Sequence, residues 1–141
     1  MSNAQLAEKK EPATADAQRL DTSALLGEWI NTNSSATGIV RLVLTQSGSR
    51  NWVRVFGAGS PASFDWGEAP VEIFAEDPAF SQATSFTSFY DLGFMSVWLQ
   101  TYVVKGVLVV ISFTQFRDGS GRSNYFGKEF FFRSGKPLAA E

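Results

Sequence analysis

The sequence predicts an all-β protein, an antiparallel up-and-down β-barrel of eight strands. Three observations lead to this prediction. Short apolar stretches with alternating patterning recur along the chain, turn-forming residues separate them, and no helical period is found after residue 22. Tight hairpins between successive strands favour a barrel. A β-sandwich, which usually needs longer connections between its sheets, is the alternative.

The chain of 141 residues is expected to contain one domain. Residues 1–22 are rich in Ala, balanced in charge and poor in large apolar side chains, so we expect a disordered leader there. Residues 23–134 are expected to form the barrel, and residues 135–141 a flexible C-terminal tail. With 44% hydrophobic residues, 13 Phe and 4 Trp, the barrel should have a packed aromatic interior.

The first half of the domain contains four expected strands. They are Leu25–Asn31, Gly38–Thr45, Asn51–Gly57 and Pro70–Ala75. Asn, Ser, Thr and Gly, which favour turns, fill the first connection, and a short turn joins the second strand to the third. Gly59 and Pro61 interrupt the pairing before the fourth strand, which we expect to be irregular.

The second half supplies four more strands. They are Ala83–Tyr90, Phe94–Val104, Val107–Phe116 and Tyr125–Arg133. The separators contain Gly with Asp, Lys or Ser, as tight turns require. The segment from Asp118 to Arg122 lacks the further acidic ligands of a calcium loop, so we interpret it as a hairpin turn.

Several function classes are excluded by residues that the chain lacks. There is no Cys and no His, which rules out disulfides, thiolate and imidazole metal sites, and Ser-His-Asp triads. We therefore expect no catalytic residue, no metal and no cofactor. A net charge of −2 leaves no basic face for nucleic acid.

The N-terminal region also bears on localisation. Residues 1–22 are polar and lack the apolar core of a signal peptide, and no apolar run is long enough to span a membrane. We expect a cytoplasmic protein without a membrane partner. If Met1 to Ala4 replaces another native start, a removed signal peptide is also compatible with the sequence.

The strand expected at Phe94–Val104 contains the candidate binding site. Successive side chains alternate between the two faces of a strand. One face presents Phe94, Ser96, Trp98, Gln100 and Tyr102; the other presents Met95, Val97, Leu99, Thr101 and Val103. Neither face is charged, so both should be covered. Rings that supply contact area, with a few polar groups that fix orientation, are typical of a ligand pocket.

We therefore predict a non-catalytic barrel that binds a small, partly apolar molecule in an aromatic and polar lumen. The aliphatic face of this strand then lies outside, where a partner subunit covers it. Two alternatives stay open. In the first, the aliphatic face fills a solid barrel, or such a barrel self-associates through an aliphatic outer face. In the second, Asp65 and Glu72 act as an acid/base pair in a hydrolase, although a solvated rim explains these carboxylates better.

The first strand resembles the calycin barrels, which include lipocalins and avidins, through Gly27-x-Trp29. Asn31 and Ser35 have a spacing similar to that of the polar pair with which avidins hold biotin. With the first face of the strand at 94–104, the resemblance adds Trp29, Asn31 and Ser35 to the expected ligand-binding residues. As in many lipocalins, Arg133 is expected to close over Trp29.

A second resemblance covers the chain from Leu25 to Arg133. Gly27-x-Trp29, Asp65-Trp66-Gly67-Glu68 and the stretch from Asp118 to Tyr125 look like an uncharacterised group of bacterial domains. In that group, two cysteines bracket a proline loop as Cys-x-Pro-x-x-Cys-Asp-Trp-Gly, whereas this chain has Gly59 and Phe64 there. Without that pair, we expect Phe64 or Trp66 to anchor the loop by packing onto the barrel.

Overall fold

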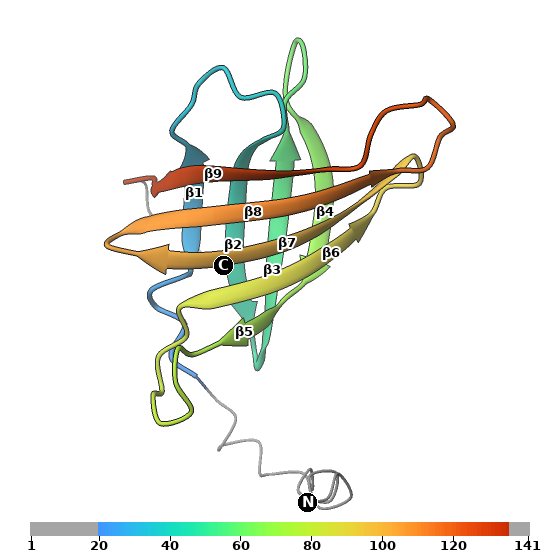
Figure 1. Cartoon of the computed structure of the whole chain (residues 1–141). Coiled ribbons are helices and arrows are strands. Elements are labelled where there is room, and N and C mark those ends of the chain that lie inside the picture. The colour runs from blue at the N-terminus through green and yellow to red at the C-terminus, as the bar shows by residue number, and fades with distance from the viewer. Residues whose placement is uncertain (1–19, 136–141) are drawn as a thin grey trace, which may run out of the picture.

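The computed structural model describes residues 20–135, and the leader and tail predicted on either side lie largely outside this part. The fold is an all-β, antiparallel, nearly closed barrel of nine strands (Figure 1). They are β1 (Gly27–Asn31), β2 (Ile39–Ser47), β3 (Arg50–Gly57), β4 (Phe64–Pro70), β5 (Glu72–Phe74), β6 (Ser85–Asp91), β7 (Met95–Val104), β8 (Val107–Phe116) and β9 (Tyr125–Arg133). In this part of the chain, no helix is long and apolar enough to cross a membrane.

The strands follow one another around the barrel in the order β4-β3-β2-β1-β9-β8-β7-β6-β5. Each pairs with its neighbour in sequence, apart from the closure of β1 against β9 and the break between β4 and β5. In Figure 1, β6 to β9 form the layer nearest the viewer and cross β1 to β4 behind them at a steep angle. The prediction of an up-and-down barrel is therefore confirmed.

The ninth strand is β4, at a place where the sequence predicted only an interruption. The pairing of β3 with β4 shifts between Arg54 and Phe56, and Gly67 in the bulge has a φ of 86°. A bulge breaks the strict alternation of side chains that a sequence-based prediction depends on. The irregularity expected for Pro70–Ala75 is thus shared by β4 and the three-residue β5.

Side chains bridge the break between β4 and β6. The Tyr90 hydroxyl lies 3.0 Å from the Val53 carbonyl oxygen and 2.8 Å from that of Gly67. Burial raises the pKa of this hydroxyl far above its usual range, so it stays protonated and donates. The Ser88 hydroxyl also donates to the Pro70 carbonyl at 3.1 Å. The barrel is closed at this point by hydrogen bonds from side chains.

The interior is filled by apolar side chains from every long strand. The largest fully buried side chains are Trp29, Phe86, Phe131, Leu25, Leu42, Leu44, Leu99, Leu108, Val53, Val55 and Val97. At one end of the barrel, the Trp29 indole donates to the Leu25 carbonyl at 2.9 Å, and the Arg133 guanidinium lies 4.7 Å from the ring centroid. The predicted closure of Arg133 over Trp29 is confirmed.

Strand β7 faces the interior with its aliphatic side. Val97 and Leu99 are fully buried, whereas Trp98 is 52% exposed on the outside of the barrel. Of the arrangements considered from the sequence, the structure has the one in which the aliphatic face fills the core. The placement of the aromatic face in the lumen and of the aliphatic face outside is therefore wrong. Aliphatic side chains pack a narrow barrel more completely than a face with Trp and Gln.

Trp66 anchors the proline loop between β3 and β4; it is one of the two residues predicted to do so. Trp66 packs against the core and meets Tyr90 edge-to-face at a centroid distance of 5.5 Å, while Phe64 is 60% exposed. Gly57 permits this approach, since a Cβ built on it would lie 2.7 Å from the Trp66 indole nitrogen.

Replacing Gly57 with Ala is expected to lower the free energy of unfolding by about 1–3 kcal/mol, because the added methyl displaces Trp66 from its packed position. Gly38→Ala is the matched control. A Cβ at Gly38 meets nothing within 4 Å, so this variant should be neutral or slightly stabilised. Urea unfolding of both variants measures the difference, and equal stability would contradict the close approach described here.

Candidate ligand site at the barrel mouth

A pocket of about 310 Å³ lies at the end of the barrel opposite Trp29. The β1–β2, β3–β4, β6–β7 and β8–β9 connections meet there, toward the top and right of Figure 1. Its apolar lining comes from Phe64, Trp66, Phe94, Met95, Phe116 and Tyr125, and its polar lining includes Thr37, Ser112, Thr114 and Arg122. The volume lies at the lower end of the range for small-molecule sites.

The tight turn between β6 and β7 positions Phe94. The Asp91 carboxylate accepts a hydrogen bond from the Gly93 amide at 3.0 Å and pairs with Arg117 at 2.8 Å. The Phe94 carbonyl accepts from the Arg117 amide at 2.8 Å, which extends the pairing of β7 with β8. These contacts fix the backbone from which the Phe94 ring reaches the pocket.

The β8–β9 connection holds Arg122 at the rim. Its guanidinium donates to Asp118 at 2.8 Å and lies 4.0 Å from the centroid of the Phe116 ring. Hydrogen bonds from Ser120, and then from Arg122, lower the pKa of Asp118 to about 2. The carboxylate therefore stays charged at all pH values near neutrality, and the predicted hairpin turn keeps its ion pair.

The floor of the mouth pocket is polar. A smaller space of about 80 Å³ shares Ile39, Ser112 and Tyr125 with the pocket and continues it to Glu129. The Asn31 amide donates to the Glu129 carboxylate and, at 2.9 Å, to the Ile39 carbonyl. Within residues 20–135, no Lys or Arg forms an ion pair with Glu129. The floor thus presents a carboxylate that no described cation neutralises.

The residues predicted to bind a ligand fall into three groups. Asn31 and Phe94 lie at the mouth, Asn31 buried in the floor and Phe94 in the lining. Trp29 lies at the closed end, and Ser35 is exposed in the β1–β2 connection. Ser96, Trp98, Gln100 and Tyr102 point away from the lumen, Ser96 being buried and the other three exposed.

The main residues of the pocket that the sequence did not reveal are Trp66, Arg122, Tyr125 and Glu129. Trp66 belongs to the bulged strand, where alternation gives no signal. Glu129 could have been found from the sequence. Arg133 was expected to lie over Trp29, and side chains alternate along a strand, so Phe131 and Glu129 share the inner face of β9 with Arg133.

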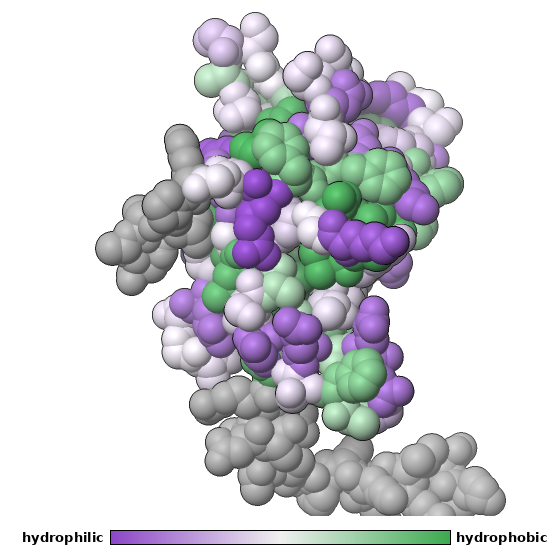
Figure 2. All heavy atoms as spheres, turned by 90° about the vertical axis from the view of Figure 1, so that its left-hand side faces the viewer, coloured by the Kyte–Doolittle hydropathy of each residue, from purple (hydrophilic) through white to green (hydrophobic). Residues whose placement is uncertain are grey.

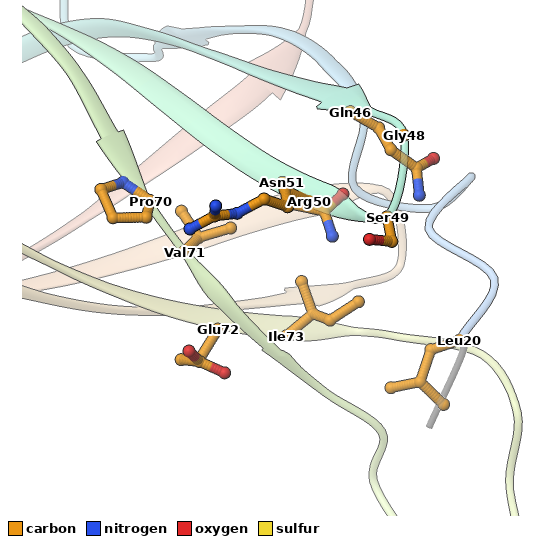
Figure 3. Close-up of a pocket in the computed structure, with 10 residues that line it drawn as sticks. All are labelled: Leu20, Gln46, Gly48, Ser49, Arg50, Asn51, Pro70, Val71, Glu72 and Ile73. Carbon is orange, nitrogen blue, oxygen red and sulfur yellow. The ribbon is translucent and has the colours of Figure 1, made fainter. Parts of the chain in front are cut away.

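A second pocket, of about 460 Å³, lies at the other end of the barrel (Figure 3). The hairpin turn around Gly48 and Ser49 forms one side, and the chain from Pro70 to Ile73 forms the other. The Asn51 side-chain oxygen is buried there without a hydrogen-bond partner among the described residues. None of its lining residues is aromatic, so it offers less stacking area than the mouth.

The carboxylates considered for acid/base chemistry lie on the outer surface. Asp65 is exposed and accepts hydrogen bonds from Arg54 at 2.6–3.1 Å, which lower its pKa. A carboxylate with a lowered pKa is a poor general acid at neutral pH. Glu72 is also exposed, and in the described part of the chain no three His, Cys, Asp or Glu side chains are grouped to hold a metal ion.

Comparison with protein-family models and with curated sequences gives no relative from which a function can be transferred. No protein-family model matches the chain, and no curated protein sequence matches it. The chemistry of the mouth must therefore be argued from its own residues.

Proposed function

We propose that this protein is a non-catalytic binding barrel of the calycin type, which holds a small molecule at its mouth. The molecule has an aromatic or otherwise apolar body and a head that donates hydrogen bonds, best a protonated amine. One observation supports this most directly: apolar side chains from β4, β7 and β8 converge on a 310 Å³ pocket whose floor carries an uncompensated carboxylate.

The apolar body would lie among Trp66, Phe94 and Tyr125, where stacking and burial supply most of the binding free energy. The head would point at Glu129, which has Asn31 as its hydrogen-bond donor and no cation among the described residues. A hydrogen bond to a charged group is worth about 1.5–3 kcal/mol, enough to select one head group over another. Small-molecule sites typically combine an apolar lining that supplies contact area with a few polar groups that fix the orientation of the ligand.

The test uses three probes with similar phenyl bodies and different heads: 2-phenylethylamine, 2-phenylethanol and 3-phenylpropanoate. Binding is followed by the fluorescence of Trp66, isolated by comparison with Trp66→Phe. We expect the amine to bind tightest and the carboxylate weakest. Glu129→Gln should reduce the affinity for the amine about tenfold or more, to that of the alcohol, because it removes the charge and keeps the shape.

Phe94→Ala should lower the affinity for all three probes about equally, since it removes part of the apolar wall of the pocket. Phe80→Ala is its matched control, because Phe80 is similarly exposed but does not line the pocket. The proposal is wrong if no probe binds, or if Phe94→Ala and Phe80→Ala behave alike. An amine preference that survives Glu129→Gln would locate the head elsewhere.

A further inference from the structure

The outer face of β5 to β9 carries side chains in register from strand to strand. Phe89, Trp98, Phe113 and Phe126 are directly paired neighbours and form one aromatic row. A parallel row consists of Phe74, Ser85, Tyr102, Val109 and Phe130. We call this surface the aromatic face. It is distinct from the mouth pocket.

The aromatic face is too large and too apolar for an ordinary exposed surface. Phe89, Trp98, Tyr102, Phe113, Phe126, Phe130 and Phe132 are each between 39% and 64% exposed. At ~200 Å² for each side chain, these residues alone offer roughly 650 Å², above the typical size of the largest apolar patch on a monomer. Figure 2 views the barrel at right angles to Figure 1, so it shows this face only edge-on; on the side that it does show, hydrophobic and hydrophilic residues are interspersed. The area approaches the roughly 800 Å² per partner of a stable interface.

One row between the two aromatic rows has opposite charges at its ends. It runs Glu72, Thr87, Gln100, Ile111 and Lys128 across five strands. Within residues 20–135, neither Glu72 nor Lys128 belongs to an ion pair, whereas Glu28 pairs with Arg41 and Arg54 with Asp65 on the strands of the other layer. Both charges of this row are thus left without a countercharge among the described residues.

We infer that the aromatic face binds a second copy of this chain in a twofold symmetric dimer. The axis would lie between the two faces, parallel to β7 and passing over Gln100. Such an axis exchanges the two ends of each row, so Glu72 of one copy faces Lys128 of the other, twice. Gln100 then faces its own symmetry mate, and an amide both donates and accepts hydrogen bonds.

The same operation matches the aromatic rows. Trp98 and Tyr102, which lie on β7, face their own counterparts across the axis. Phe89 faces Phe113, and Phe74 faces Phe130, because these pairs lie on strands at equal distances from β7. Strand directions stay aligned, as in face-to-face packing of sheets. A partner unrelated to this chain would not require charges of opposite sign at symmetric positions.

The decisive experiment is a charge swap in the full chain, followed by sedimentation velocity from ~1 to ~200 µM, a range that includes weak interfaces of this size. Glu72→Lys and Lys128→Glu each place two like-charged pairs across the interface, and each should weaken the dimer about tenfold or more. The double variant E72K/K128E restores opposite charges and should recover the affinity of the native chain. Glu76→Lys, in the β5–β6 connection, is the control for charge alone.

Trp98→Ser should separate the copies entirely, because it removes the largest apolar contact on the axis. Native circular dichroism of each variant checks that the fold is kept. The inference is overturned if the native chain remains a monomer throughout the range. If such a monomer binds lipid vesicles or a soluble glucan through the aromatic face, that face has a different occupant, and the inference is equally overturned. It is also overturned if the dimer forms but neither single charge reversal weakens it, or the double variant fails to recover.

Discussion

Replacing Trp29 with Ala is expected to lower the free energy of unfolding by about 3–5 kcal/mol, one of the two largest effects that the structure predicts. The indole is 1% exposed, donates a hydrogen bond to Leu25, and lies beneath the guanidinium of Arg133. Truncation leaves a cavity at the closed end of the barrel and an unpaired Leu25 carbonyl. Urea unfolding at low protein concentration measures the loss.

Trp29→Phe serves as the control, since it keeps an aromatic ring below Arg133 and removes the indole N–H together with the part of the ring system that carries it. Its loss should be well below that of the Ala variant. If both substitutions cost the same, the hydrogen bond to Leu25, and not the filling of the barrel end, dominates the contribution of Trp29.

Of two adjacent residues on β7, truncating the smaller one, Leu99, should lower the free energy of unfolding more than truncating the larger one, Trp98. Leu99→Ala is expected to cost about 2–5 kcal/mol, because Leu99 is 1% exposed within the core. Trp98→Ala removes far more atoms, yet we expect a cost below about 1 kcal/mol in the monomer, since the ring lies outside the barrel and retains mainly its contact with Phe89. Thermal unfolding of the two variants, at a concentration where the chain is monomeric, gives the comparison.

A larger loss for Trp98→Ala than for Leu99→Ala would mean that β7 turns its aromatic face inward, as first expected from the sequence. That outcome would also remove the aromatic face on which the dimer depends.

The difference between the predicted and observed faces of β7 has a physical origin. Alternation tells which residues share a face but not which face is inside, and both faces of this strand are uncharged. What decides is the set of side chains on the facing strands: Leu42, Val55 and Leu108 form one buried cluster with Val97 and Leu99, and a core is packed closely by the combined shapes of all its side chains. The sequence of one strand does not contain this information.

Other features could be predicted because they depend on local patterns. The Gly27-x-Trp29 resemblance to the calycin barrels implied that Arg133 closes over Trp29, and the guanidinium does lie over the indole. The polar floor could not be predicted from local patterns, because Asn31 and Glu129 are far apart in sequence and meet only where β1 pairs with β9. The mouth was missed because four connections, each unremarkable as a sequence, assemble it in space.

The join between β4 and β6 is held differently from the rest of the barrel wall. In a barrel closed by backbone ladders, strand number and stagger fix the diameter, and any widening breaks a series of main-chain hydrogen bonds. Here the hydrogen bonds described across the join are donated by the hydroxyls of Tyr90 and Ser88, and a hydroxyl can rotate to suit its acceptor. Widening the wall along this line would therefore break side-chain hydrogen bonds and leave every backbone ladder in register, and Trp66, which meets Tyr90 edge-to-face and lines the pocket, links this line to the mouth.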